Sequence, residues 1–288
     1  MSAIFSIFAV PFGYVMRYIY QFVGSYGVSI ILFSLLAKLL MMPVSLKQKR
    51  SMMKTQAIQP KIQALQKQYG KDQQRLNQEL QDLYAREDVS PMGGCGTMLI
   101  TMPIMIGLYY VISTPLTYFM LLSADQIATL TERLSGAVAA LGDIIGKGTN
   151  MQVVLAGLIK DNFGAVADIS ANILPVDYNF LGLNLAATPD FKSFGLLWII
   201  PILSGLTAFG MSMVTQKLAA KANPQAQEGA MASQTKMMAL MMPAMSVVFG
   251  FMLPAGLGLY WIANNIFTAA QEFILQKFIL NKDEKPGA

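Results

Sequence analysis

Apolar residues in this chain gather into long runs that short polar segments separate. A helix that crosses a bilayer needs about 20 consecutive, mostly apolar residues. Five runs reach or approach that length. Pro254, Ala255 and Gly256 alone separate the last two, which predicts a tight turn and a helical hairpin. The pattern therefore predicts an all-α integral membrane protein with five transmembrane helices. The predicted spans are residues 26–46, 92–122, 194–216, 237–253 and 257–280.

The first 25 residues predict a helix of a different kind. Their periodicity suits an amphipathic helix that lies in the membrane interface, on the outer face of the protein, over residues 1–25. Pro11 marks a natural helix start within this segment, because proline is favoured in the first helical turn. Arg17 interrupts the apolar stretch, which argues against a signal peptide. A frayed extension of the first span is the alternative interpretation. The apolar positions at helical spacing are Phe12, Val15, Met16, Ile19 and Val23.

Residues 47–91 predict a helical hairpin on the cytoplasmic side. Gly70 can end its first helix and Asp72 can cap the second. The outer faces are basic and rich in glutamine, so the hairpin is either a solvated face near anionic lipid or a docking arm for a partner. The two apolar stripes that would pack together are Ile58, Ile62, Leu65 and Tyr69, and Leu76, Leu80, Leu83 and Tyr84.

Positive charge is distributed unevenly between the two sides of the spans. The chain has 21 Lys and Arg against 16 Asp and Glu. Most of these cations fall in residues 47–91, in the loop 217–236 and around the tail 281–288. Because basic loops stay in the cytoplasm, we expect the N-terminus outside and the C-terminus in the cytoplasm. The cations on the other side are Arg17, Arg133, Lys147, Lys160 and Lys192.

Residues 123–193 form the long loop expected on the outer side. Two amphipathic stretches, 127–145 and 151–159, alternate with turn residues and predict a cap without visible chemistry. Its acidic residues are scattered without the spacing of metal ligands: Asp125, Glu132, Asp143, Asp161, Asp168, Asp177 and Asp190.

The residue types present exclude several classes of protein. Only 13% of the residues are charged, against about 25% in soluble domains. There is no histidine, and Cys95 is the only cysteine. A Ser-His-Asp hydrolase and a Cys/His zinc site are therefore excluded. With no phosphate-binding glycine loop or paired carboxylates either, we expect no enzyme, no cofactor and no metal.

A few polar residues lie inside the predicted spans. Lys38 sits midway along the first, where a charge costs about 2.5–3.5 kcal/mol and is functional by default. Ser34 lies one turn earlier. Lys38 either snorkels to the interface, pairs with Glu272, or lines a hydrated cavity open to the cytoplasm. Isolated hydroxyls such as Thr101 are weaker signals. A polar stripe at helical spacing follows the last span: Tyr260, Asn264, Thr268, Gln271 and Glu272.

Several short motifs resemble those of one family, the YidC/Oxa/Alb membrane protein insertases, in its short bacterial form. The resemblance covers all five spans and the hairpin, whereas the outer loop is similar only over residues 180–185. The motifs are Lys38-Leu-Leu-Met-Met-Pro43, Gln59-Pro60-Lys61-Ile62-Gln63, Pro91-Met-Gly-Gly-Cys95, Met102-Pro103-Ile104, and Leu253-Pro-Ala-Gly-Leu-Gly-Leu-Tyr260-Trp261 with Asn265 following.

The resemblance implies a hydrophilic groove that is closed on the outer side and open to the cytoplasm and to lipid. Lys38 occupies the position of the groove charge, which is usually arginine in the family. Lysine keeps the charge but lacks the planar fork that grips a carboxylate at two points. The polar lining would comprise Ser34, Thr101, Tyr260, Asn264, Asn265, Thr268, Gln271 and Glu272.

A client's apolar segment would slide into lipid along the second and fourth spans, whose methionines offer a soft surface. Ordinary packing is the alternative role for these methionines. The residues of this predicted slide are Met102, Ile106, Met237, Met238, Met241, Met242 and Met245.

The resemblance also implies partners and a location. Clients would be nascent membrane proteins with short polar or acidic tails, inserted into the bacterial plasma (inner) membrane without nucleotide hydrolysis. The Sec translocon, the signal recognition particle receptor and the ribosome are expected partners beside membrane lipid, and no specific nucleic-acid sequence is expected. The short tail 281–288 predicts no long basic ribosome-binding extension. A small transporter or channel that uses Lys38 and Glu272 as a charge relay is the alternative, although no inverted repeat supports it.

Overall fold

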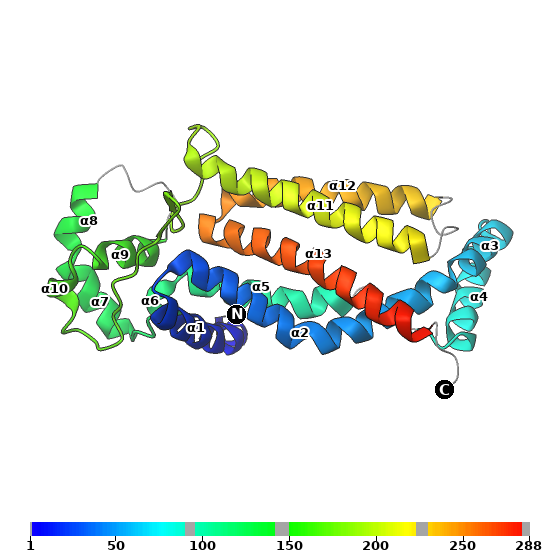
Figure 1. Ribbon diagram of the computed structural model, residues 1–288, viewed down its shortest axis with the longest axis horizontal. Coiled ribbons are helices and arrows are strands. Elements are labelled where there is room, and N and C mark those ends of the chain that lie inside the picture. Colours follow the sequence, from blue (N-terminus) through cyan, green and yellow to red (C-terminus); the bar gives the residue numbers. More distant parts are fainter. Residues whose placement is uncertain (1, 90–95, 142–149, 223–229, 284–288) are drawn as a thin grey trace. The chain divides into compact units, whose positions relative to one another are not determined.

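The computed structural model describes residues 2–89, 96–141, 150–222 and 230–283, and these residues are mostly helical (Figure 1). The only strands in this described part form one short antiparallel pair. The elements are α1 (Ser2–Val23), α2 (Tyr26–Ala57), α3 (Gln59–Tyr69), α4 (Gln73–Arg86), α5 (Gly96–Ser113), α6 (Pro115–Tyr118), α7 (Ala124–Arg133), α8 (Ser135–Leu141), α9 (Met151–Ile159), α10 (Phe163–Val166), β1 (Asn179–Phe180), β2 (Leu183–Asn184), the 3-10 helix η2 (Leu196–Trp198), α11 (Ile199–Ala222), α12 (Ala230–Met252) and α13 (Ala255–Asp283).

Long helices occur where the sequence predicts membrane spans. Among the described residues, Tyr26–Ala57 and Leu196–Leu218 are long and apolar enough to cross a bilayer. Met102–Ser113 and Ala239–Met252 are shorter apolar stretches. The structure is therefore that of a largely helical protein with at least two segments suited to a membrane, and the count of five spans stays a prediction.

Contacts divide the chain into two compact units. The first unit comprises Met1–Ala37, Thr101–Leu206 and Met245–Asn264. The second unit comprises Lys38–Ile100, Thr207–Ala244 and Asn265–Ala288.

The prediction that a helix starts at Pro11 is wrong. Helix α1 begins at Ser2 and contains Pro11 in its interior. Proline removes one backbone hydrogen bond, but packing can hold the helix on both sides of it. Ala9 and Met16, one before and one after the proline, are both completely buried, which explains why the helix continues.

A large apolar core holds the first unit together. Its centre is a group of aromatic rings in edge-to-face contact, with Tyr26 lying 5.8 Å from Phe119 and 4.7 Å from Tyr178, measured between ring centroids. Such pairs contribute about 0.5–1.5 kcal/mol each beyond their burial. Helices α1 and α6 approach closely, because Gly13 leaves no Cβ against the backbone of Tyr118.

The segment predicted as a cap folds onto this core. Strands β1 and β2 pair Asn179 with Asn184 and Phe180 with Leu183. Leu181 and Gly182 form the turn, with φ angles of 53° and 81°. A two-residue hairpin loop of type I′ requires positive φ at both central residues, and its backbone twist matches that of the flanking strands.

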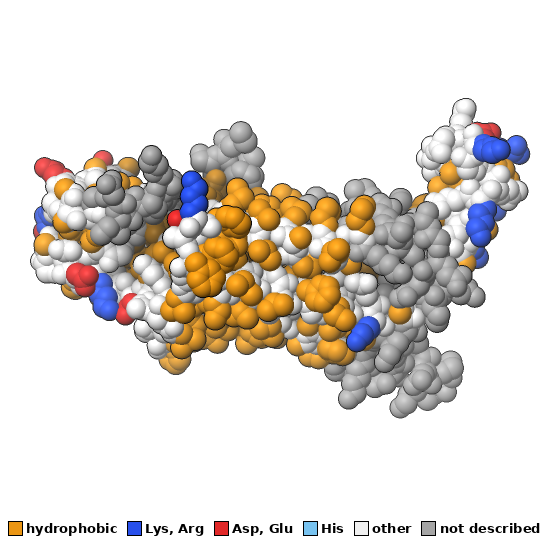
Figure 2. Space-filling view, turned by 90° about the horizontal axis from the view of Figure 1, so that it is seen from above, with side chains coloured by type: hydrophobic (Ala, Val, Ile, Leu, Met, Phe, Trp, Pro, Cys, Tyr) orange, Lys and Arg blue, Asp and Glu red, His pale blue; other side chains and the backbone are white. Residues whose placement is uncertain are grey.

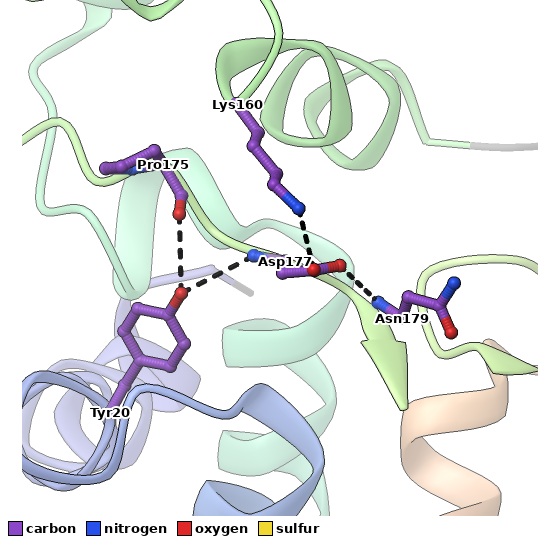
Figure 3. Close-up of polar contacts among 5 residues, drawn as sticks. All are labelled: Tyr20, Lys160, Pro175, Asp177 and Asn179. Atoms are coloured by element: carbon purple, nitrogen blue, oxygen red, sulfur yellow. Dashed lines mark hydrogen bonds and ion pairs between the residues drawn. The ribbon is translucent and has the colours of Figure 1, made fainter. Parts of the chain in front are cut away.

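A small polar network ties α1 to this segment (Figure 3). The Tyr20 hydroxyl donates to the Pro175 carbonyl at 3.4 Å and accepts from the Asp177 backbone N–H at 3.4 Å. Asp177 accepts from Lys160 Nζ at 2.7 Å and from the Asn179 backbone N–H at 2.9 Å. The bond from Lys160, followed by that from Asn179, lowers the pKa of the Asp177 carboxyl below its ordinary value.

Helices α3 and α4 pack against each other in the second unit. The Asp72 side chain accepts from the Arg75 backbone N–H at 3.0 Å, so it caps α4 as the sequence predicts. A cluster of Ile58, Ile62 and Val89 is buried here. Leu80, Leu83 and Tyr84 pack against that cluster, so both apolar stripes contribute to one small core.

Candidate functional site: polar groups of the second unit

Lys38 carries a charge that no acidic side chain in the described part of the chain neutralises directly. It lies half-buried on α2, which runs unbroken from Tyr26 to Ala57 through Pro43. Among the described residues, no carboxylate lies within ion-pair distance of its amine. Glu272 acts on it electrostatically, but from farther away.

The acid near Lys38 is bound by another lysine. Glu272 forms an ion pair with Lys49, and the two side chains are only 18% and 12% exposed. The structure therefore does not show the Lys38–Glu272 pair that the sequence leaves open as an alternative. Lys49 follows Lys38 by about three helical turns and falls on nearly the same face of α2, since 11 residues make slightly more than three turns. The two amines therefore compete for one carboxylate, and Lys49 binds it.

Further polar groups link the helices of this unit. Asn265 Nδ2 on α13 donates to Thr207 Oγ1 on α11 at 3.2 Å. The Ser212 hydroxyl on α11 donates to the Ala239 carbonyl on α12 at 3.2 Å. Gln271 is 7% exposed, and its Nε2 has no hydrogen-bond partner in the described part of the chain. A buried amide donor of this kind is available to a polar group that enters the unit.

Helix α13 has a sheltered polar face and an exposed apolar face. Tyr260 is 3% exposed, and Asn264, Thr268 and Glu272 are half-buried. Apolar side chains cover the other side of the helix, the reverse of the pattern in a soluble protein. Such a helix suits a lipid environment, because lipid cannot satisfy the polar groups. The exposed apolar side chains are Ile266, Phe273 and Ile274, at 52%, 55% and 44%.

The remaining predicted lining residues lie elsewhere or are not described. Ser34 belongs to the first unit, is 1% exposed and donates to the Ile30 carbonyl of its own helix at 2.8 Å. Tyr260 and Asn264 also belong to the first unit. The side chain of Thr101 lies outside the described residues.

Hydroxyl contacts between α11 and α12 are a feature that the sequence suggests only weakly. Ser204 and Ser246 lie 2.7 Å apart, oxygen to oxygen, within the first unit. Together with the bond from Ser212, this contact shows that α11 and α12 run antiparallel and side by side (Figure 1). Isolated serines in apolar helices give no sign of their partners, so the sequence pattern could not pair them.

The residues of the predicted slide are largely exposed. Figure 2 shows hydrophobic side chains over much of the viewed surface. Ile106 is half-buried, and the side chain of Met238 lies outside the described residues. The exposed members are Met102, Met237, Met241, Met242 and Met245, at 46%, 66%, 49%, 61% and 41%.

Comparison with known proteins decides the family. The sequence-family model described as "60Kd inner membrane protein" matches residues 18–283. The chain belongs to this family, that of the YidC/Oxa/Alb membrane protein insertases. The match includes every long helix from α2 to α13.

Curated relatives support the same family. The chain is 29% identical to the membrane protein insertase MisCA of Bacillus subtilis, over 96% of this chain and 80% of MisCA. It is 31% identical to the membrane protein insertase YidC of Rickettsia rickettsii and 30% identical to that of Rickettsia conorii, each over 95% of this chain. The chain spans only 39% of each Rickettsia protein. Membership of this family therefore indicates that the function is insertion of membrane proteins and that the location is the inner membrane.

Proposed function

We propose that this chain inserts membrane proteins by offering the unneutralised charge of Lys38 to a polar or acidic client tail. The observation that supports this most directly is the Lys49–Glu272 ion pair, which engages the acid that acts electrostatically on Lys38. The electrostatic attraction between a carboxylate and a lysine amine 4 Å apart is about 4 kcal/mol at an effective dielectric constant of 20. That attraction offsets part of the cost of carrying a charged tail into the bilayer.

The client tail would enter from the cytoplasm and be solvated by polar side chains on α13. In this proposal the groove contains Asn265, Thr268 and Gln271 beside Lys38, and Asn264 continues its polar side on the same helix. The unpartnered Nε2 of Gln271 supports a role in binding a backbone or side-chain carbonyl. No step needs nucleotide hydrolysis, because the apolar part of the client gains free energy on entering lipid.

The apolar segment of the client would move into lipid along exposed methionines of α5 and α12. Methionine has flexible, polarisable side chains that adapt to varied sequences. The exposure of Met102, Met237, Met241 and Met242 supports this role.

The full topology belongs to this proposal. Five spans, with the N-terminus outside and the α3–α4 pair in the cytoplasm, fit the uneven distribution of Lys and Arg. A cytoplasmic α3–α4 pair would lie where the Sec translocon, the signal recognition particle receptor or the ribosome could reach it.

A photo-crosslinking experiment tests the groove. The crosslinker is placed at Asn264 or, as a matched control, at Ile266, which is 52% exposed two residues away on the same helix. During insertion into liposomes, a client with an acidic tail should crosslink through that tail from position 264 and not from position 266. Equal crosslinking from both positions, or crosslinking from 266 alone, would refute a polar groove along α13.

A further inference from the structure

A basic pocket lies within the second unit, away from Lys38. It is a cavity of about 810 Å³ between the end of α2 and the end of α4. This volume is within the range of about 300–1,000 Å³ typical of small-molecule sites. The basic pocket is lined by Lys47, Arg50, Ser51 and Lys54 of α2 and by Gln81, Tyr84, Ala85, Asp88 and Val89.

The α4 side of the basic pocket is held in place by its own contacts. Tyr84 packs against the buried cluster that includes Ile58 and Ile62. The Val89 backbone N–H donates to the Tyr84 carbonyl at 3.0 Å. Lys61 pairs with Glu87 at 2.5 Å in the turn that follows α4. Contacts within the protein therefore fix the α4 side of the pocket.

The charge of the basic pocket favours an anion. Three cations line it, and Asp88 is the only acid among its lining residues. Asp88 lies 3.7 Å from Lys54 and is 99% exposed, so it neutralises little of the positive charge. Arg50 can donate two parallel hydrogen bonds to a phosphate, and lysines add point charges.

The exposed face of α2 changes from apolar to basic as it approaches the pocket. Leu40 is 65% exposed, and Pro43, Lys47, Arg50 and Lys54 follow it on the exposed side at intervals of three or four residues. Residues at this spacing share one helix face. An apolar stripe that leads directly into a cluster of cations matches the order of acyl chain and phosphate in a phospholipid.

We propose that the basic pocket binds the phosphate headgroup of an anionic phospholipid, whose acyl chains lie along Leu40 and the neighbouring Leu39. Arg50 and the two lysines bind the phosphate. Ser51, Gln81 and Tyr84 offer hydroxyl and amide groups to a polyol headgroup such as glycerol. Leu39 is 55% exposed, and such an apolar approach suits a lipid better than a free phosphate or an RNA backbone.

The test measures lipid binding to the purified protein in uncharged detergent. Short-chain phosphatidylglycerol and short-chain phosphatidylcholine are titrated, and bound lipid is counted by native mass spectrometry. The wild type should prefer phosphatidylglycerol. Each cation near a membrane surface contributes roughly fivefold to affinity, so the variant K47Q/R50Q/K54Q should bind it roughly a hundredfold more weakly. The matched control K67Q/K71Q/R86Q loses the same charge on exposed positions outside the pocket and should bind as the wild type does.

Competition identifies the source of the phosphate. Excess inorganic phosphate or a short RNA should leave phosphatidylglycerol bound. Displacement by either would overturn the lipid assignment, and equal loss in both triple variants would show that only net charge matters. Where circular dichroism shows that K47Q/R50Q/K54Q does not fold, R50Q alone decides the question, with a roughly fivefold loss expected and an unchanged affinity contradicting the site. Because the measurement is of lipid, its outcome is independent of insertion activity.

Discussion

At the scale of single residues, Lys49 sets the environment of Lys38. A lone lysine in an apolar helix would ordinarily take the nearest carboxylate as its partner. Here Glu272 is bound to Lys49, within a part of the structure where both side chains are largely sheltered from solvent. In the proposed mechanism, Lys38 thus keeps a charge that a client can use.

Removing Lys49 should therefore weaken insertion of clients, because it releases the carboxylate of Glu272. In K49A the freed carboxylate is expected to bind Lys38, which reduces the charge offered to a client. Insertion of an acidic-tail client should fall roughly tenfold, equivalent to about 1.4 kcal/mol. The measurement is protease protection of the client in liposomes.

The double variant K49A/E272Q separates this effect from a loss of stability. Without the carboxylate, Lys38 is free again, so insertion should recover toward the wild-type rate. A double variant as slow as K49A would mean that Lys49 acts by itself. K61A, which removes a lysine from an ion pair in the α3–α4 region, serves as the control and should insert normally.

The hydrogen bonds of Tyr20 lead to a second prediction at the scale of single residues. Its hydroxyl joins α1 to Pro175 and Asp177, and the side chain is only 9% exposed. Y20F leaves the Asp177 backbone N–H without its acceptor, so the free energy of unfolding should fall by about 1–2 kcal/mol. Thermal unfolding in detergent measures this. Y18F changes a 67% exposed side chain and should unfold like the wild type; equal effects in both variants would argue against the network.

The sequence could indicate Lys38 but not its surroundings. A charge in an apolar run is visible from the residues alone, because its cost does not depend on tertiary contacts. The Lys49–Glu272 pair joins residues 223 positions apart. Lys38 and Lys49 lie on nearly the same face of α2, so helical periodicity allows either lysine to be the partner of Glu272. Only the folded positions of α2 and α13 distinguish between them.

At the scale of elements, close helix packing depends on particular glycines. Gly250 on α12 faces Pro201 of α11, where an added Cβ would lie 2.9 Å from the Pro201 Cα. Gly13 on α1 faces the Tyr118 carbonyl even more closely. A backbone carbonyl cannot rotate away as a side chain can, so the contact at Gly13 requires glycine.

G13A should therefore destabilise the first unit. Separation of α1 from α6 would disturb the aromatic core nearby, and a loss of about 1–3 kcal/mol is typical of overpacking. The readout is the thermal unfolding midpoint. G210A on α11 is the matched control, since nothing lies within 4 Å of the added methyl group, and alanine there should be neutral or stabilising by up to about 1 kcal/mol. A G13A protein as stable as G210A would contradict the close approach.

The elements themselves were predictable to the extent that local pattern determines them. The apolar runs identified the places of α2, α5, α11, α12 and α13. The ends of helices were less predictable, because α2 continues past residue 46 to Ala57 and α1 starts before Pro11. Helix α1 continues through a proline that usually marks a helix start, and α2 continues past the end of its apolar run. Contacts or helix-forming side chains maintain the helix in both places.

At the scale of the whole molecule, the two units have different interiors. The first unit contains a large apolar core in which aromatic rings pack edge to face. In the described part of the second unit, the buried apolar cluster comprises Ile58, Ile62 and Val89, and polar groups join its long helices. A unit with few buried apolar contacts opens at lower free energy. We therefore expect the second unit to change conformation when a client enters.

The central claim is that the charge of Lys38 attracts the client, and a charge exchange tests it most directly. Wild type, K38A, K38R and K38E are purified into liposomes, and insertion of a single-span client with an acidic tail or a basic tail is measured by protease protection. Wild type and K38R should insert the acidic client, K38A should do so roughly tenfold more slowly, and K38E should favour the basic client. If all four variants insert both clients equally well, the charge of Lys38 is not what draws the client in.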